Sequence, residues 1–263
     1  MRSIKVIPTI LMLLILTFTM SACDFSAIGS TLTPTVTHTP MSTWTATVIP
    51  SETPTPSSTP KPTRTPNFAA TQKIEDFHAE AQRYFDLGYF STTDGVFKRQ
   101  PTYEYDWAQI NWYRRNPIYN VEVSDFFITA HITWSSAYRN ANTSGCGFSF
   151  AEQENGDHYA VFLDRSKVLF VKTDYYYRPI GPVRGSGLVK FDNPFDAPVE
   201  ADLTLIVNGT QAFVLVDGEF VAEYALSQSG TLKGTLAYSI LSGTNKDFGT
   251  RCNWSDIHIF VPN

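Results

Sequence analysis

The chain has 263 residues and a formal net charge of −5, and aromatic residues make up 14% of it. After residue 66 the balance is 16 Lys and Arg against 23 Asp and Glu, a net charge of −7. This argues against nucleic acid and against electrostatic docking on an anionic membrane, because both partners need a basic surface. The 197 residues after residue 66 are enough for one domain with a sizeable core.

Residues 1–22 have the organisation of a signal peptide, with two basic residues near the start and a short apolar stretch from Ile10 to Phe18. Ser21 and Ala22 then precede Cys23, which resembles the lipobox of bacterial lipoproteins. The resemblance implies cleavage before Cys23, acylation of Cys23 by fatty acids such as palmitate, and anchorage at the extracytoplasmic face of the cell membrane. An ordinary secretory signal with an incidental cysteine, or a retained transmembrane anchor, is the alternative.

Residues 23–66 are predicted to form a lipidated, disordered stalk. Residues 31–66 contain 13 Thr and 8 Pro but only three charged side chains. Such a composition cannot bury enough apolar surface to offset its ordering entropy, and proline favours an extended backbone. At full extension the segment would span about 110 Å, so we expect it to hold the following domain away from the membrane.

Residues 67–94 are predicted to contain one amphipathic helix, residues 68–87, and a connection. Apolar residues recur at three- and four-residue steps, and Gly88 is expected to end the helix as a left-handed cap. The expected apolar face consists of Ile74, Phe77, Ala81, Tyr84, Phe85 and Leu87. We expect this face to pack against the sheet domain; a partner-binding helix is the alternative.

Residues 95–263 show short apolar runs separated by turn residues. This pattern predicts an antiparallel β-sandwich, because a parallel sheet needs crossover helices and the segment has no helical periodicity. Asn208-Gly209 and Asp217-Gly218 are predicted hairpin turns. The expected strands are Phe126–Trp134, Cys146–Phe150, His158–Leu163, Val168–Lys172, Leu203–Val207, Ala212–Val216, Phe220–Tyr224, Gly234–Leu241 and Ile257–Val261.

The chain contains three cysteines. With Cys23 assigned to lipid, Cys146 and Cys252 remain as a single pair in an oxidising compartment, and we expect a disulfide between them. Two buried free thiols are the alternative. No Cys-x-x-Cys or His-x-x-His spacing indicates a metal site, and we predict neither a metal nor a cofactor.

Three segments resemble concanavalin A-like jelly rolls. They are Gly145–Phe150 with Asp157–Phe162, Leu203–Gly209 with Phe213–Val221, and Trp254–Val261. The likeness extends to laminin G-like domains and to relatives grouped with 3-keto-disaccharide hydrolases. It implies a mainly β fold of the jelly-roll type, preceded here by one amphipathic helix. It does not imply one activity, because this fold carries lectins, glycosidases, adhesion modules and spacers.

Retaining glycosidases of this fold carry an E-x-D-x-x-E pattern that supplies a nucleophile and an acid. The nearest match runs from Glu104 through Asp106 to Gln109, with Gln in place of the acid. Glu152 and Glu154 adjoin Asn155-Gly156 and are expected to lie at a hairpin turn. His131 and His258 alternate with apolar neighbours and are expected to be satisfied or solvent-facing strand residues. We therefore predict no catalytic residues.

Aromatic residues next to arginine occur in three predicted connections between strands. Aromatic rings pack against the apolar C–H faces of sugars, and Arg donates hydrogen bonds to sugar hydroxyls. The alternative is that these rings cover the ends of the sandwich. The candidate ligand-binding residues are Trp112, Tyr113 and Arg114; Tyr138 and Arg139; and Tyr175, Tyr176, Tyr177 and Arg178.

The sequence therefore favours a membrane-anchored, surface-displayed, non-catalytic module that binds carbohydrate or a protein partner. One alternative is a glycoside hydrolase or lyase of the 3-keto-disaccharide hydrolase type, which needs carboxylates that converge in a cleft. The other is a structural spacer or adhesin with no small ligand.

Overall fold

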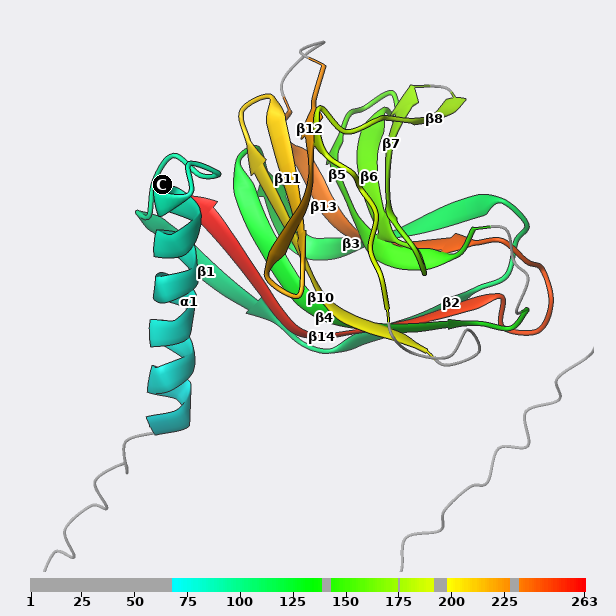
Figure 1. Ribbon diagram of the computed structural model, residues 1–263, viewed down its shortest axis with the longest axis horizontal. Helices are drawn as coiled ribbons and strands as arrows, with labels where there is room; N and C mark the ends of the chain where they lie inside the picture. Colours follow the sequence, from blue (N-terminus) through cyan, green and yellow to red (C-terminus); the bar gives the residue numbers. More distant parts are fainter. Residues whose placement is uncertain (1–67, 139–142, 175, 192–197, 228–231) are drawn as a thin grey trace, which may run out of the picture. The chain divides into compact units, whose positions relative to one another are not determined.

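Two antiparallel β-sheets face each other across an apolar core (Figure 1). The computed structural model describes residues 68–138, 143–174, 176–191, 198–227 and 232–263. The predicted signal peptide, Cys23 and the stalk lie outside the described residues. Within the described part, no helix combines the length and the apolar character needed to cross a bilayer. The prediction of an antiparallel β-sandwich with one N-terminal helix is confirmed.

One sheet has eight strands. Its order is β1 (Gly95–Gln100), β14 (Thr250–Pro262), β4 (Phe126–Ser136), β10 (Val199–Asn208), β11 (Gln211–Val216), β12 (Glu219–Ala225) and β9 (Arg184–Gly185), with β2 (Tyr103–Trp107) also paired to β14. The other sheet has six strands. Its order is β3 (Trp112–Val123), β13 (Gly234–Ser242), β5 (Gly145–Glu152), β6 (His158–Leu163), β7 (Val168–Asp174) and β8 (Tyr176–Pro179).

The chain passes repeatedly between the two sheets. It enters the six-stranded sheet at β3, leaves it at β4, returns for β5 to β8, and contributes β13 after β9 to β12. Alternate side chains of each strand point inward, so apolar residues of both sheets meet in one core. On β4 the inward residues are Phe126, Ile128, Ala130, Ile132 and Trp134, all of them buried.

All nine predicted strands are present, and several extend further than expected. The prediction that residues 112–115 and 176–178 lie in connections is wrong, because they belong to β3 and β8. These strands form the two edges of the six-stranded sheet, where polar side chains are tolerated and no continuous apolar run is required. Pro117 also obscured β3, although proline is acceptable in an edge strand that has a free side.

The hairpin turns follow the sequence with one shift. Val216 pairs with Glu219, so Asp217 and Gly218 form the predicted turn, and both have a positive φ. In the other hairpin Asn208 itself pairs with Gln211. The turn residues there are Gly209 and Thr210, one position later than predicted.

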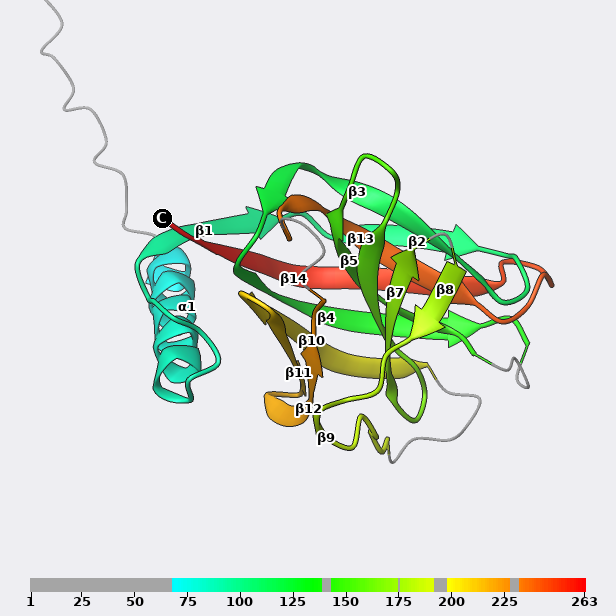
Figure 2. The ribbon, with the colours of Figure 1, turned by 90° about the horizontal axis from the view of Figure 1, so that it is seen from above.

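Helix α1 (Phe68–Asp86) packs against the outer face of the eight-stranded sheet through the buried Ala81 and Tyr84. Gly88 follows it with a φ of 70°, as the left-handed cap requires. Phe85 and Leu87, which we expected on the packed face, are 45% and 49% exposed. Both views place α1 and β8 on opposite sides of the sandwich (Figure 1, Figure 2). The helix therefore leaves the outer face of the six-stranded sheet uncovered.

The predicted disulfide is confirmed between Cys146 of β5 and Cys252 of β14, whose Cα atoms lie 6.0 Å apart. It joins the two sheets through the core, where both cysteines are fully buried.

Candidate functional site

The six-stranded sheet curls so strongly that side chains from distant strands meet on its outer face. The Tyr113 hydroxyl on β3 lies 2.5 Å from His158 Nε2 on β6 and also contacts Thr173 Oγ1 on β7. In a flat sheet β3 and β7 would lie about 19 Å apart, which one tyrosine side chain cannot span. The outer face is therefore concave, and Tyr113 reaches across it.

Two glycines of β5 face this concave side. A Cβ atom at Gly145 would lie 2.4 Å from the carbonyl oxygen of Leu163, and one at Gly147 would lie 2.1 Å from that of Val161. Both carbonyls belong to the neighbouring β6, so only glycine permits this close approach of the two strands. The Gly-x-Gly pattern that suggested a jelly roll thus has a steric cause in the packing of β5 against β6.

An apolar cluster separate from the main core lines the concave face. Its buried members are Tyr113, Ala160, Phe162, Val171 and Leu241. A polar group lies beside it, where Arg115 and Glu152 form an ion pair of 2.6 Å with side chains that are 25% and 31% exposed. Ser239 pairs with Arg115 across the strands and is fully buried. The concave face therefore combines an apolar floor with donors and acceptors that solvent reaches.

The hydrogen bonds of His158 define which tautomer the neutral ring adopts. Nδ1 lies 2.7 Å from the carbonyl oxygen of Gly156, which can only accept, so Nδ1 carries the proton. Nε2 then accepts a hydrogen bond from the Tyr113 hydroxyl. Burial is the main cause that lowers the pKa of His158, and burial raises the pKa of Tyr113.

Trp112, Tyr113 and Tyr177 form a continuous set of rings, which we call the aromatic platform. The ring centroids of Trp112 and Tyr113 lie 6.3 Å apart, and those of Tyr113 and Tyr177 lie 5.8 Å apart. Trp112 is 55% exposed and Tyr177 is 37% exposed, whereas Tyr113 is buried between them. Burial raises the pKa of Tyr177 to about 12, so its hydroxyl stays protonated at neutral pH. The structure thus joins residues of two separate predicted clusters.

The other candidate residues lie elsewhere. The Arg114 guanidinium lies 5.1 Å above the Trp107 ring, and Tyr138 lies under the Lys246 ammonium at 4.2 Å. Tyr176 precedes Tyr177 on β8 and therefore points to the opposite face of the strand. Arg178 forms an ion pair of 3.1 Å with Asp174. Arg139 and Tyr175 lie outside the described residues.

Of the carboxylates considered for catalysis, Glu152 lies on the concave face in its ion pair with Arg115, and the others lie apart from the platform. Glu104 and Asp106 are on β2, in the eight-stranded sheet, where Glu104 contacts the Asn253 amide. Arg251 donates to both oxygens of Asp106, at 2.9 Å from Nε and 2.8 Å from Nη2. Glu154 lies in the turn between β5 and β6, as predicted, whereas the same prediction is wrong for Glu152, which is the last residue of β5.

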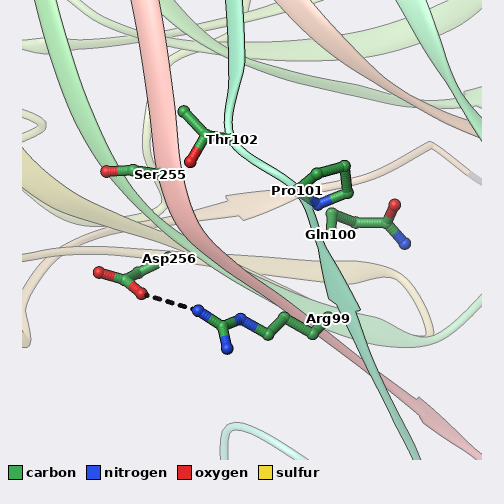
Figure 3. A pocket seen from close by; sticks show the side chains of 6 residues that line it. All are labelled: Arg99, Gln100, Pro101, Thr102, Ser255 and Asp256. Carbon is green, nitrogen blue, oxygen red and sulfur yellow. Dashed lines mark ion pairs between the residues drawn. The ribbon is translucent and has the colours of Figure 1, made fainter.

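A polar hollow that the sequence did not indicate lies where β1 ends and β2 begins (Figure 3). Arg99 and Asp256 form an ion pair of 3.5 Å across it, and both side chains are about 60% exposed. Asp256 has a φ of 45° where the register of β14 shifts. The six lining residues are Arg99, Gln100, Pro101, Thr102, Ser255 and Asp256, none of them aromatic. The hollow therefore lacks the flat apolar surface that the aromatic platform offers.

The strand histidines have protein partners. His131 Nδ1 lies 2.8 Å from Asp202 Oδ1, and its Nε2 lies 3.3 Å from Glu200 Oε1. The His258 ring packs on Phe77 of α1, with the two ring centroids 3.8 Å apart. Among the residues that the structure describes, no group of three or more His, Cys, Asp or Glu side chains has an arrangement suited to a metal ion.

No family model matches the sequence, and comparison with the curated proteins finds no match. Distant similarities to solved structures exist. A carbohydrate-binding module, CBM66, from Bacillus subtilis has a TM-score of 0.42 and 11% identity over 64% of this chain and 97% of the module. The Aspergillus kawachii β-fructofuranosidase complexed with glycerol has a TM-score of 0.41 and 11% identity over 63% of this chain and 27% of the enzyme. The botulinum neurotoxin serotype D binding domain has a TM-score of 0.41 and 8% identity over 64% of this chain and 44% of that domain. At these scores the similarity assigns neither a family nor an activity.

Proposed function

We propose that this protein is a surface-displayed, non-catalytic carbohydrate-binding module and that its binding face is the aromatic platform. The observation that carries the proposal is the contact between Tyr113 and Tyr177, which gathers rings from the two edges of the six-stranded sheet. Tyr177 keeps part of its ring in solvent on the concave face. Trp112 precedes Tyr113 and therefore leaves β3 on the other side of the strand, but its ring is 55% exposed at the edge of the sheet and lies 6.3 Å from the Tyr113 ring. Exposed rings next to hydrogen-bonding groups are what a sugar ring needs.

Polar groups for sugar hydroxyls lie on the same face. Arg115 follows Tyr113 by two residues on β3 and therefore shares its side of the strand. The ion pair of Arg115 with Glu152 neutralises both charges while leaving part of each side chain in solvent. A face with balanced charge and exposed rings favours a neutral sugar over a uronic acid.

The test is binding of the full chain to an oligosaccharide panel. We expect Trp112→Ala and Tyr177→Ala to weaken binding by at least about tenfold each. This corresponds to a loss of about 1.4 kcal/mol of binding free energy for each ring. Tyr176→Ala is the matched control, because Tyr176 is on the same strand and 64% exposed but faces away. Equal binding by all three variants would refute the platform. Release of shortened sugars would favour the hydrolase alternative.

We also propose that the domain is held at the membrane through a lipid on Cys23, with residues 31–66 as a spacer. Support comes from the small residues before Cys23 and from the pairing of the other two cysteines with each other. Mass spectrometry of the native protein should find a chain that begins at an acylated Cys23. The Cys23→Ser variant should lose the lipid mass and its membrane association. An unmodified Cys23 would contradict the anchor without affecting the platform.

A further inference from the structure

The Tyr113 hydroxyl is part of a directed chain of hydrogen bonds. His158 donates from Nδ1 to the carbonyl of Gly156 and accepts at Nε2 from Tyr113. Tyr113 donates its only proton to His158, so its contact with Thr173 is one in which the Thr173 hydroxyl donates. While His158 is neutral, the carbonyl at the end of the chain determines each direction. The bond from Nδ1 to Gly156 would survive protonation, whereas the bonds from Tyr113 to Nε2 and from Thr173 to Tyr113 need the neutral ring.

The surroundings of His158 disfavour the imidazolium. The side chain is only 5% exposed, and burial is the main cause that lowers its pKa. Among charged neighbours, Arg115 on β3 also lowers this pKa, while Glu152 on β5 and Asp157 at the turn before β6 raise it. Lys172 on β7 lines the same small cavity as His158. The aromatic neighbour on this side is Tyr113, whose ring centroid lies 5.7 Å away.

We propose that His158 is a positioning residue that holds the aromatic platform together while it is neutral, and that acidification releases the platform. The expected effect of His158 on sugar binding rests on the proposed function, because the platform is the site of that function. The positioning itself is a property of the free protein.

The release follows from the proton count. Protonated His158 must donate from Nε2, so Tyr113 and Thr173 must both turn their hydroxyls around a buried charge. We call the arrangement with the hydrogen bond between His158 and Tyr113 closed, and one without it open. The ordinary pKa of His158 is 6.5, and burial in the closed arrangement lowers it, so the open arrangement binds more protons. The closed arrangement therefore has its full stability above about pH 6.5 and loses it as the pH falls from there toward the lowered pKa. Movement of Tyr113 would let water reach the imidazolium and would separate Trp112 from Tyr177.

The first test needs no ligand. In the full chain labelled with ¹³C-histidine and ¹³C-tyrosine, the His158 ring signal is identified by its absence from His158→Gln, and the Tyr113 signal by its absence from Tyr113→Phe. We expect His158 to titrate below pH 6.5 and the Tyr113 ring signal to change over the same pH range. A Tyr113 signal that stays constant while His158 titrates would overturn the proposal.

The second test measures affinity for the best oligosaccharide of the panel at pH 7.5 and pH 5.0. We expect binding by the natural protein to weaken several-fold at the lower pH, because protonation of His158 favours the arrangement without its hydrogen bond to Tyr113. His158→Gln should keep the binding and lose the pH dependence, because the Gln carbonyl can accept from Tyr113 but does not titrate. His131→Gln, on the other sheet, is the matched control and should keep the pH dependence.

The two tests separate the two proposals. If no oligosaccharide binds at either pH but the Tyr113 signal still follows His158, the proposed function fails and the positioning role stands. If sugar binds and its pH dependence persists in His158→Gln, the positioning role fails and the proposed function stands.

Discussion

Tyr113 on β3 and Tyr177 on β8 have ring centroids only 5.8 Å apart, although their strands form opposite edges of the six-stranded sheet. The curl of the sheet produces this contact and buries an apolar cluster on a face that would otherwise be open to solvent. Stability and the proposed binding face therefore depend on the same curvature.

The glycines of β5 provide a direct test of that curvature. Gly147→Ala places a methyl group 2.1 Å from the carbonyl oxygen of Val161, so β5 and β6 must separate. We expect a loss of about 1–3 kcal/mol in the free energy of unfolding, measured with urea. Gly181→Ala is the control, because a Cβ there meets no atom within 4 Å. Equal stability of the two variants would show that the close approach of β5 and β6 is not required.

The disulfide is expected to contribute strongly to stability. Cys146 and Cys252 are separated by 106 positions, and closing a loop of that size stabilises a fold by about 4–5 kcal/mol at most, by restricting the unfolded chain. The double variant Cys146→Ala, Cys252→Ala should lose a corresponding part of its free energy of unfolding and should therefore unfold at a lower urea concentration. Reduction of the natural protein should shift its unfolding in the same direction. Two alkylatable thiols in the native, unreduced protein would contradict the bridge.

Adjacent residues of α1 should respond very differently to truncation. Tyr84 is 1% exposed and lies against Phe127, with ring centroids 5.1 Å apart. Tyr84→Ala should therefore cost about 3–5 kcal/mol in urea unfolding, as for other buried aromatic residues. Phe85→Ala, at a side chain that is 45% exposed, should cost less than about 1 kcal/mol. Similar losses in both variants would argue against the observed orientation of α1.

His131 should show the opposite pH behaviour to His158. The hydrogen bond from His131 to Asp202 is the main cause that raises its pKa. The stability that this pair contributes is complete below the ordinary pKa of 6.5 and is lost as the pH rises through the raised value.

The Asp202→Asn variant checks this assignment. NMR titration should show a lower pKa for His131 in this variant, and the stability difference from the natural protein should be larger at pH 5.5 than at pH 8.5. Glu200→Gln should have a smaller effect, because Glu200 is 65% exposed and lies 3.3 Å from the ring. A His131 pKa that is the same with and without Asp202 would refute the assignment.

Several elements were predictable because their causes are local. The helical spacing of Ala81 and Tyr84, followed by Gly88, determines α1 and the centre of the face that it buries, although Phe85 and Leu87 of the expected face are exposed. Asp217-Gly218 determines a hairpin, because both residues tolerate a positive φ. The pairing of Cys146 with Cys252 followed from counting cysteines rather than from geometry.

The strands that carry the aromatic platform were not predictable in the same way. β3 and β8 are edge strands and lack the apolar periodicity that identifies a central strand. All four residues of β8 are exposed, and β3 mixes buried and exposed residues. The separation of Tyr176 from Tyr177 depends on strand alternation, which is invisible while the segment is taken for a loop.

Sequence alone thus determined the fold class, the helix, most strands and which residues had the chemistry to bind a sugar, because composition, periodicity and turn chemistry act over a few neighbouring residues. The folded sheet, by contrast, brings Trp112 and Tyr177 to Tyr113, places Arg114 and Tyr138 elsewhere, and sets His158 against the Tyr113 hydroxyl. Those contacts depend on how far the six-stranded sheet curls, and that curl results from the packing of all its strands together.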